Sequence, residues 1–307
     1  MQVTVVIPTF KRLDYLRQAI DSVCRQTYPN FRCIVVNDCP ADASALARII
    51  AEFKDDRLHL INHERTSGGN AARNTGIIQA QGEIIAFLDD DDCWLPEKLQ
   101  RHIQQHTANP HAGLIFSGVI KRWSDEIIPD KIIRAKLPPR VVTAMNQGQF
   151  CPTTTSGVTV RRECFTNCGL FDTSLVSFQD WDMWYRIALK YDFEAIDSAL
   201  VVFRQHLGDR TSKSKAKRLQ GLEQLTTKWQ SDLDNAPQFE AIFTKDTYVS
   251  SVYNAILRSQ RKAALQDWYT LLKLTKHLSD VPLLLKLIIM WVINGKNYGR
   301  LSRPKKL

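Results

Sequence analysis

Short apolar runs alternate with amphipathic stretches over roughly the first ninety residues. The apolar runs are continuous and rich in β-branched side chains, which is typical of strands buried on both faces of a parallel sheet. They cover residues 3–7, 31–36, 58–61 and 83–88. Between the runs, apolar residues recur at helical spacing, as in Leu13, Leu16, Ile20 and Val23. The pattern predicts an α/β fold, βαβαβαβ, with a parallel sheet and helices on both of its faces.

The regular alternation weakens after the fourth strand. We expect a strand at 113–117, and then an irregular stretch over 118–156 that four prolines interrupt. A long irregular stretch beside a strand end is typical of a wall of a binding site. Residues 157–161 predict another strand, 180–190 a helix and 193–203 edge strands.

The composition changes near residue 210, where basic and polar residues gather. We therefore expect a first domain at 1–210 and a helical C-terminal region at 211–307. Within that region, residues 281–293 are apolar almost all round, and a helix of this length would measure only about 20 Å, too short for a bilayer core. Five basic residues follow it, namely Lys296, Arg300, Arg303, Lys305 and Lys306. The segment could lie on an anionic membrane surface, or it could be a core helix of the C-terminal bundle.

Composition narrows the class of protein. The chain has 307 residues, 44% of them hydrophobic and 24% charged, and its net charge is +9. This charge favours phosphorylated ligands, anionic lipid or nucleic acid as partners. Seven cysteines without a CxxC pair indicate free thiols in a reducing compartment. Met1 leads directly into a strand without a signal-like segment, so we expect a cytoplasmic protein.

Four consecutive acids, Asp89, Asp90, Asp91 and Asp92, follow the strand at 83–88 directly. Pro96 and Glu97 then open a helix. The acids therefore lie at the carboxyl end of a strand, where open α/β sheets bind ligands. Adjacent carboxylates repel one another unless a cation is present, and such oxygen ligands suit Mg²⁺ or Mn²⁺. The alternative is a solvated acidic turn.

Other polar residues follow neighbouring strands. Asp38 could accept hydrogen bonds from a nucleoside, or it could be a turn or helix-capping acid. Thr9 and Arg12 would border the same crevice. Gly68 and Gly69 permit close approach of a phosphate, although a glycine pair can also be an ordinary turn. Arg73 could pair with the acids or with a diphosphate, or it could be a solvated surface residue.

Several segments in a fixed order resemble the family-two glycosyltransferases, which are inverting, nucleotide-sugar-dependent enzymes. They are Val5–Arg12, Gln26–Asn30, Val35–Asp38, Ala72–Gly76, Phe87–Asp92, Pro96–Leu99, Gly169–Asp172 and Gln179–Trp184. The resemblance covers about residues 3–206. It implies a GT-A fold, a Rossmann-like doubly wound mixed sheet, here with a C-terminal helical appendage.

The resemblance also implies roles for individual residues. In the family's DXD motif, Asp89 would face the ribose and the metal, and Asp91 would be the direct ligand of Mn²⁺ or Mg²⁺. His206 resembles a late histidine that approaches the metal and diphosphate in some members, or it is a surface histidine. Asp92 would orient the turn or cap the following helix. The residues implied in donor binding are Pro8, Thr9, Arg12, Asp38, Gly69, Arg73, Asp89 and Asp90.

Asp180 matches the general base of the family. Trp181 and Trp184 could stack on a sugar and raise the pKa of this base, or they could be core residues. Gln179 stands where the family usually has Glu, which could alter electrostatics and acceptor preference. No QxxRW motif follows Asp180, which argues against a processive synthase.

The resemblance thus predicts metal-dependent transfer of a sugar from a UDP-, GDP- or dTDP-sugar to a glycan or lipid-linked acceptor in cell-surface polysaccharide or lipopolysaccharide assembly. The enzyme would be cytoplasmic and peripheral on the inner face of the membrane. A sugar-phosphate nucleotidyltransferase is an alternative, but the first strand is not followed by a glycine-rich loop. A nucleic-acid-binding protein is a further alternative, but the basic residues lack interleaved aromatics, so we expect no nucleic-acid partner. We expect the pairs His102/His106 and Cys164/Cys168 to be structural.

Overall fold

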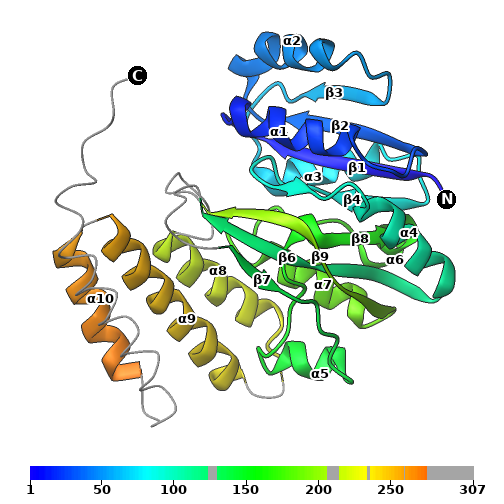
Figure 1. Ribbon diagram of the computed structural model, residues 1–307. Helices are drawn as coiled ribbons and strands as arrows, with labels where there is room; N and C mark the ends of the chain where they lie inside the picture. The colour runs from blue at the N-terminus through cyan, green and yellow to red at the C-terminus, as the bar shows by residue number, and fades with distance from the viewer. Residues whose placement is uncertain (124–129, 206–213, 234–235, 259, 275–307) are drawn as a thin grey trace. The chain divides into compact units, whose positions relative to one another are not determined.

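The computed structural model describes residues 1–123, 130–205, 214–233, 236–258 and 260–274 (Figure 1). These residues form two compact units. The described residues within 1–145, 149–174 and 179–206 make the first unit, and those within 146–148, 175–178 and 207–307 make the second. The domain boundary expected after residue 210 falls at 206–213, outside the described residues, as do His206 and the segment 281–293.

The first unit is built on a mixed sheet. Its strands are β1 (Val3–Thr9), β2 (Phe31–Asn37), β3 (Leu58–Asn62), β4 (Ile84–Phe87), β5 (Cys93–Trp94), β6 (Ala112–Trp123), β7 (Lys131–Ile133), β8 (Val158–Arg161) and β9 (Asp192–Gln205). The helices that begin in it are α1 (Leu13–Cys24), α2 (Ala43–Phe53), α3 (Gly69–Ile78), α4 (Lys98–Ala108), α5 (Val141–Asn146), α6 (Arg162–Cys168) and α7 (Gln179–Ala188), with 3₁₀ turns η1 (Pro40–Asp42) and η2 (Thr155–Gly157). The strand order is β3-β2-β1-β4-β8-β6-β9-β5, and β7 pairs with β6.

The strands β3, β2, β1 and β4 lie side by side and run parallel, as the sequence predicts (Figure 1). The central residues of β1, β2 and β4 are buried because helices cover both faces of the sheet, whereas those of the edge strand β3 are half-buried. On one face, Val5 and Ile7 belong to the same buried cluster as Leu16 of α1. On the other face, Gly76 of α3 lies so close to Val6 that a Cβ atom there would come within 2.3 Å of Val6 Cγ1. The doubly wound arrangement is therefore confirmed.

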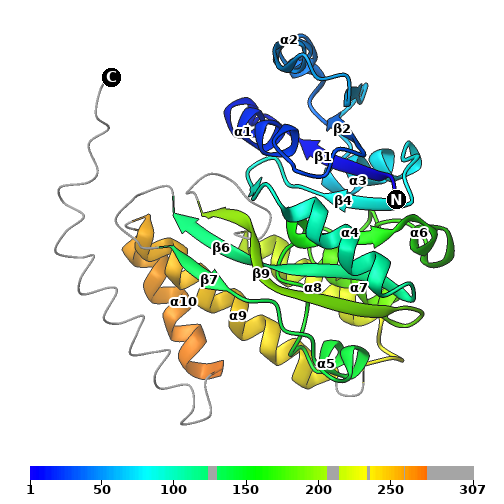
Figure 2. The same cartoon turned by 45° about the vertical axis from the view of Figure 1, so that its right-hand side comes forward.

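The second half of the sheet corrects two expectations. The stretch 118–156 is not irregular throughout, because β6 continues to Trp123 and β7, α5 and η2 follow. Residues 192–205 form one long strand, β9, that runs beside β6 (Figure 2). In the strand order it lies between β6 and β5, so these residues do not form edge strands. The β6–β9 pairing shifts register beside Gly118, whose Cβ would meet Ile133 O at 2.4 Å. Such irregular pairing depends on partners distant in sequence, which periodicity alone does not reveal.

The described part of the second unit that follows residue 213 consists of α8 (Lys215–Lys228), α9 (Ala236–Leu257) and α10 (Arg261–Leu274). Val252, Ala255 and Ile256 of α9 pack with Ala264 and Leu271 of α10 in one buried cluster. Helices without strands in this described part agree with the sequence pattern. Across the described ranges, no helix has both the length and the apolar character needed to span a bilayer.

Candidate functional site

The turn after β1 is tied to the acidic segment after β4. Thr9 Oγ1 donates to Asp90 Oδ2 at 2.9 Å, and the Phe10 backbone N–H donates to the same oxygen at 3.3 Å. Arg12 donates to Asp90 Oδ1 at 2.9 Å and to Asp91 Oδ2 at 3.0 Å. These contacts hold together two segments that follow adjacent parallel strands. Pro8 is buried in β1 and lies opposite Val36 of β2.

Burial controls the protonation of Asp90. Desolvation of this buried carboxyl raises its pKa to about 6, although the nearby charge of Arg12 lowers it. Asp91 is also buried, at 4% exposure, and shares Arg12 with Asp90. Arg12 therefore offsets part of the repulsion between two adjacent aspartates.

Asp89 is the most solvent-exposed carboxylate of the four. Its side chain is 29% exposed, and Arg73 of α3 donates to its Oδ1 at 2.6 Å. Gly69 lies at the start of α3 next to this arginine, and a Cβ there would be in ordinary contact with Arg73 Nη1, at 3.4 Å. The Asp89 backbone N–H donates to Ser156 Oγ at 3.1 Å. The first acid is thereby fixed in its backbone while its carboxylate stays accessible.

Asp92 organises the fold around the acids. It is fully buried, and it accepts hydrogen bonds from Ser156 Oγ at 2.6 Å and from the Arg204 backbone N–H at 3.2 Å. The helix after it begins at Lys98 and has Glu97 at its N-cap. Asp92 therefore orients the turn, and it joins β4 to η2 and β9.

Asp38 lies at the carboxyl end of β2 and is buried. Its Oδ1 accepts from Ser67 N at 2.8 Å, and its Oδ2 accepts from Gly68 N at 2.8 Å. His63 Nδ1 lies 2.8 Å from Asp38 Oδ1, and its Nε2 lies 2.8 Å from Thr75 Oγ1. This carboxylate thus holds the glycine turn that leads into α3. No sequence signal marked His63 or Ser156 in advance, because each is an isolated residue of a loop or short turn.

Asp180 lies in the first turn of α7 and is half-buried. Its Oδ1 accepts a hydrogen bond from Trp181 N at 2.9 Å. Burial raises its pKa above the ordinary range for aspartate. The charge of Arg73 lowers the pKa and that of Asp89 raises it, so Asp180 lies within electrostatic reach of the acidic segment. A carboxyl with a raised pKa beside a charged site is a candidate proton acceptor.

Burial decides between the two alternatives for the tryptophans near Asp180. Trp181 and Trp184 are 1% and 0% exposed, so they belong to the core and offer no open face to a sugar. Trp181 stacks on Tyr185 at 4.8 Å, and Trp184 packs against Phe87 and Phe171. Their contribution is to bury the start of α7, which raises the pKa of Asp180.

The remaining candidate pairs are structural. His102 and His106 are buried in α4, and both contact Thr159 Oγ1, at 2.9 and 3.0 Å. All seven cysteines are free thiols, Cys164 and Cys168 among them.

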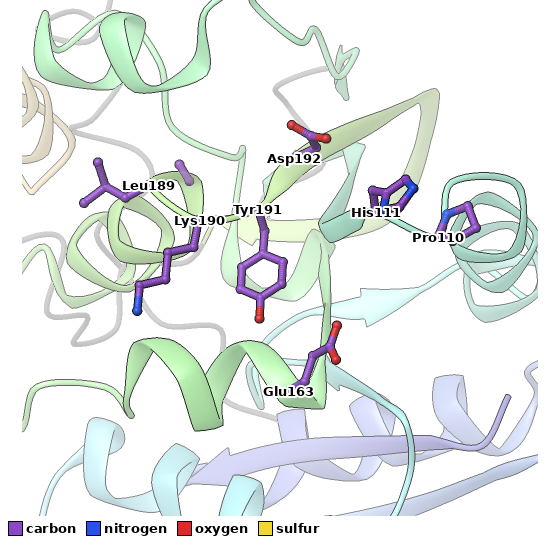
Figure 3. Close-up of a pocket in the computed structure, with 8 residues that line it drawn as sticks. Pro110, His111, Glu163, Leu189, Lys190, Tyr191 and Asp192 are labelled. Carbon is purple, nitrogen blue, oxygen red and sulfur yellow. The ribbon is translucent and has the colours of Figure 1, made fainter.

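A surface cavity of about 590 Å³ lies elsewhere on the first unit (Figure 3). Its lining includes His111 before β6, Glu163 of α6 and Asp192 at the start of β9. It therefore lies at the amino ends of β6 and β9, whereas the carboxylates follow the carboxyl end of β4, which runs parallel to them. None of the candidate site residues lines it.

The site geometry can be compared with known proteins. A family model described as "Glycosyl transferase family 2" matches residues 4–165, more than half of the chain. A putative colanic acid biosynthesis glycosyl transferase, WcaA of Escherichia coli, is 29% identical over 79% of this chain and 86% of its own length. The chain is also 27% identical to WfgD of Escherichia coli, a UDP-Glc:alpha-D-GlcNAc-diphosphoundecaprenol beta-1,3-glucosyltransferase, over 71% of this chain and 82% of WfgD.

Two solved structures share the fold. TarS 1-349 of S. aureus in complex with UDP-GlcNAc has a TM-score of 0.59 and 16% identity, covering 100% of this chain and 93% of that one. The mannosyltransferase PcManGT of Pyrobaculum calidifontis, in complex with GDP-Man and Mn2+, has a TM-score of 0.59 and 18% identity, covering 96% of this chain and 87% of that one. At these identities the likeness shows the fold alone. The match to the family model, which covers more than half of the chain, shows that this chain is an enzyme that belongs to glycosyltransferase family 2.

Proposed function

We propose that the protein is an inverting, metal-dependent enzyme that transfers a sugar from a nucleotide-sugar donor to a hydroxyl of a glycan or lipid-linked acceptor. The observation that carries this proposal is the set of ion pairs beyond the carboxyl ends of β1 and β4, where Arg12 pairs with Asp90 and Asp91 and Arg73 pairs with Asp89. Asp180, whose pKa is raised by burial, would be the proton acceptor that a single displacement at an anomeric carbon requires.

In this mechanism Asp180 takes the proton of the acceptor hydroxyl while that oxygen attacks the anomeric carbon. The bond between the anomeric carbon and the phosphate oxygen breaks, and the nucleoside diphosphate leaves with the bonding electrons. Arg12 and Arg73, which pair with Asp91 and Asp89, supply positive charge on the side of the acidic segment. Attack from the face opposite the leaving group inverts the configuration.

The residues present fit a divalent cation. Asp89 and Asp91 provide two carboxylates, and Mg²⁺ typically binds through one or two carboxylates together with water and phosphate oxygens. Within the described ranges, no group of three or more Asp, Glu, His or Cys side chains is placed to hold a metal ion. Water and phosphate oxygens would therefore have to complete the coordination of the ion. Asp89 and Asp91 would hold Mn²⁺ or Mg²⁺, and the bound ion would offset the charge of the leaving diphosphate.

Donor binding would take place beyond the carboxyl ends of β1, β2 and β4. Asp38 holds Ser67 N and Gly68 N, so it would shape the glycine turn and present its remaining acceptor capacity to a nucleoside. The names of the relatives support different donors, since WfgD uses UDP-Glc and PcManGT was solved with GDP-Man. The names of WcaA and WfgD support cell-surface polysaccharide assembly on a lipid-linked acceptor.

We also propose that the enzyme works as a peripheral protein on the cytoplasmic face of a membrane. The segment 275–307 has seven basic residues and one acid. Leu265, Tyr269 and Leu272 of α10 are 53%, 62% and 44% exposed, at a spacing that brings them onto one helix face. The only acid of α10, Asp267, is buried. An apolar helix face with basic neighbours favours an anionic lipid surface.

A thermal-shift panel tests the donor. UDP-, GDP- and dTDP-sugars, each with Mn²⁺, are added to the full chain. We expect one nucleotide class to raise the melting temperature, because a ligand that binds only the folded state stabilises it by mass action. The shift should shrink when EDTA replaces Mn²⁺. A chain that none of these compounds stabilises, with or without Mn²⁺, would contradict the proposed function.

A further inference from the structure

The four residues that precede α7, the helix that carries Asp180, belong to the second compact unit. Leu175–Phe178 belongs to the second compact unit, while Gln179 begins α7 and returns the chain to the first. Asp180 follows Phe178 by only two residues. The four residues that precede α7 therefore make their tertiary contacts mainly within the second unit.

Helix α8 contacts two successive residues of this segment. The Val176 backbone N–H donates to Gln224 Oε1 at 3.1 Å. Ser177 packs against Gly221 so closely that a Cβ at position 221 would lie 2.7 Å from Ser177 Cβ and 2.9 Å from its backbone nitrogen. Only glycine leaves room for this approach, so the segment backbone is held directly against the helix.

Phe178 is held in an uncommon backbone conformation. Its φ of 59° lies in the left-handed region, which is costly for a bulky residue and persists only where its surroundings enforce it. Its ring meets Phe243 of α9 edge-to-face at 5.2 Å, and the guanidinium of Arg218 lies 5.1 Å from the ring centroid. Arg218 is itself held by Asp246 at 2.8 Å. These contacts enforce the backbone turn immediately before α7.

We infer that α8 and α9 position the general base. By holding Leu175–Phe178, they determine where the first turn of α7 begins and how the Asp180 carboxylate is oriented. Gln224, Gly221 and Phe243 are positioning residues that act through this segment. The inference rests on the proposed function of Asp180. It implies that changes in α8 and α9 alter the rate of sugar transfer.

Gln224 offers a matched set of variants. Gln224→Met keeps the length of the side chain and removes the acceptor for Val176 N–H, whereas Gln224→Glu keeps an acceptor oxygen. Leu271→Ala opens a cavity in the buried cluster of α9 and α10 and serves as a control for general destabilisation of the helices. Amide hydrogen exchange is measured on each full-length folded variant. We expect faster exchange across residues 176–182 in Gln224→Met, and parental exchange there in Gln224→Glu and Leu271→Ala.

Kinetics test whether the effect passes through Asp180. With the sugar nucleotide that the thermal-shift panel selects, Gln224→Met should lower kcat about tenfold to a hundredfold and leave the KM for the donor unchanged, because misplacement of a catalytic group costs rate. In an Asp180→Asn background the same change should cost nothing further, since two changes that act on one group are not additive.

The outcomes separate the inference from the proposed function. An Asp180→Asn variant with the parental rate contradicts the proposed base and the inference with it. A slow Asp180→Asn variant, combined with parental exchange at 176–182 in Gln224→Met, overturns the inference alone. Faster exchange at 176–182 in Leu271→Ala, equal to that in Gln224→Met, would also overturn it, because general loosening of the helices would then be the cause.

Discussion

Four consecutive aspartates differ in their surroundings, and those surroundings decide what each can do. Asp90 and Asp92 are buried and accept hydrogen bonds from neighbouring segments, so they hold the fold of the site together. Asp89 keeps a partly exposed carboxylate beside Arg73. Asp91 shares Arg12 with Asp90. The acid run is therefore one exposed carboxylate supported by buried ones.

Replacement of Asp91 and of Asp92 should separate metal binding from folding. Asp91→Ala should leave a folded protein but abolish both transfer and Mn²⁺-dependent nucleotide binding, because it removes one of two proposed ligands. Asp92→Ala should retain part of the nucleotide binding but lower the free energy of unfolding by about 1–3 kcal/mol, since Ser156 and the Arg204 amide lose their buried acceptor. Calorimetric titration with the nucleotide and urea unfolding check these outcomes. Mn²⁺-dependent binding at full strength in Asp91→Ala would disprove the ligand assignment.

The raised pKa of Asp180 predicts the pH dependence of transfer. The rate should fall on the acid side as Asp180 becomes protonated, at a pH above the ordinary aspartate value of about 3.9. Asp180→Asn should slow transfer by roughly a hundredfold or more and remove this acid limb, while donor binding stays near normal. Rate profiles recorded from about pH 4 to about pH 9 measure the position of the limb. A parental rate in Asp180→Asn would mean that another group takes the proton.

Gln179 provides a second test of the same carboxylate. Its Oε1 is buried and has no hydrogen-bond partner among the described residues. Gln179→Glu would add a negative charge next to Asp180, which disfavours the charged form of the base and should move the acid limb to higher pH. Gln179→Met is the neutral control and should leave the limb in place. Equal profiles for the two variants would show that position 179 does not tune the base.

At the scale of an element, α4 carries three basic side chains into the core. Lys98, His102 and His106 are fully buried on one face of this helix. Lys98 Nζ lies 4.0 Å from the centroid of the Trp94 ring, and burial lowers the pKa of Lys98 well below its ordinary value. Burial also lowers the pKa of His106, to about 3. The buried face of α4 therefore carries three basic side chains, and their burial disfavours the protonated form of each.

This packing predicts acid sensitivity of the fold. The pKa of His106 is about 3 in the folded chain and about 6.5 in the unfolded chain, so the unfolded state binds the extra proton between these values. The stability contributed by neutral His106 is complete above pH 6.5 and is lost as the pH falls toward 3. Between pH 7.5 and 5 the loss should be about 2 kcal/mol.

Urea unfolding at pH 7.5 and 5 measures this loss. His106→Gln should reduce the difference between the two free energies of unfolding, because glutamine does not titrate. His111→Gln changes an exposed histidine of the same unit and should leave the difference as it is in the parent. A parental difference in His106→Gln would contradict the assignment of the effect to the buried ring.

At the scale of the whole molecule, basic residues concentrate toward the C-terminus of the sequence, and three exposed apolar side chains lie on α10. Seven basic residues lie within 275–307, and the exposed apolar side chains of α10 directly precede them in the chain. Each cation near an anionic surface contributes about 1 kcal/mol, and salt screens this attraction. Apolar side chains that enter the lipid interface add a part that salt does not remove.

We therefore expect the full chain to bind vesicles that contain phosphatidylglycerol and to ignore vesicles of phosphatidylcholine alone. Leu265→Ser combined with Leu272→Ser should weaken this binding and increase its sensitivity to salt. Ile132→Ser, at an exposed apolar residue of β7, is the matched control and should bind like the parent. Co-sedimentation at several salt concentrations measures these effects. Failure of the full chain to bind anionic vesicles at low salt would exclude membrane attachment of this kind.

The first four strands, their helices and the parallel order of the strands were predictable from sequence. Each strand is a continuous apolar run, and each helix has its own local period, so both signals lie within about twenty residues of chain. The position of the acids at the carboxyl end of β4 was predictable for the same reason, and their role in ligand binding stays a prediction. Because carboxylates at the end of a buried strand need a compensating charge, their chemistry follows from their position.

Only the tertiary structure decided which distant residues complete the site. Ser156 and His63 contact Asp92 and Asp38 across wide gaps in sequence, and nothing in their neighbours marks them. Periodicity did not distinguish core tryptophans from a sugar platform, since burial depends on what packs against them. The pairing of β9 with β6 and the hold of α8 and α9 on Leu175–Phe178 likewise arise from contacts between segments far apart in the chain. The local sequence pattern determines where helices and strands form. Packing between segments distant in sequence determines which helices, strands and side chains contact one another.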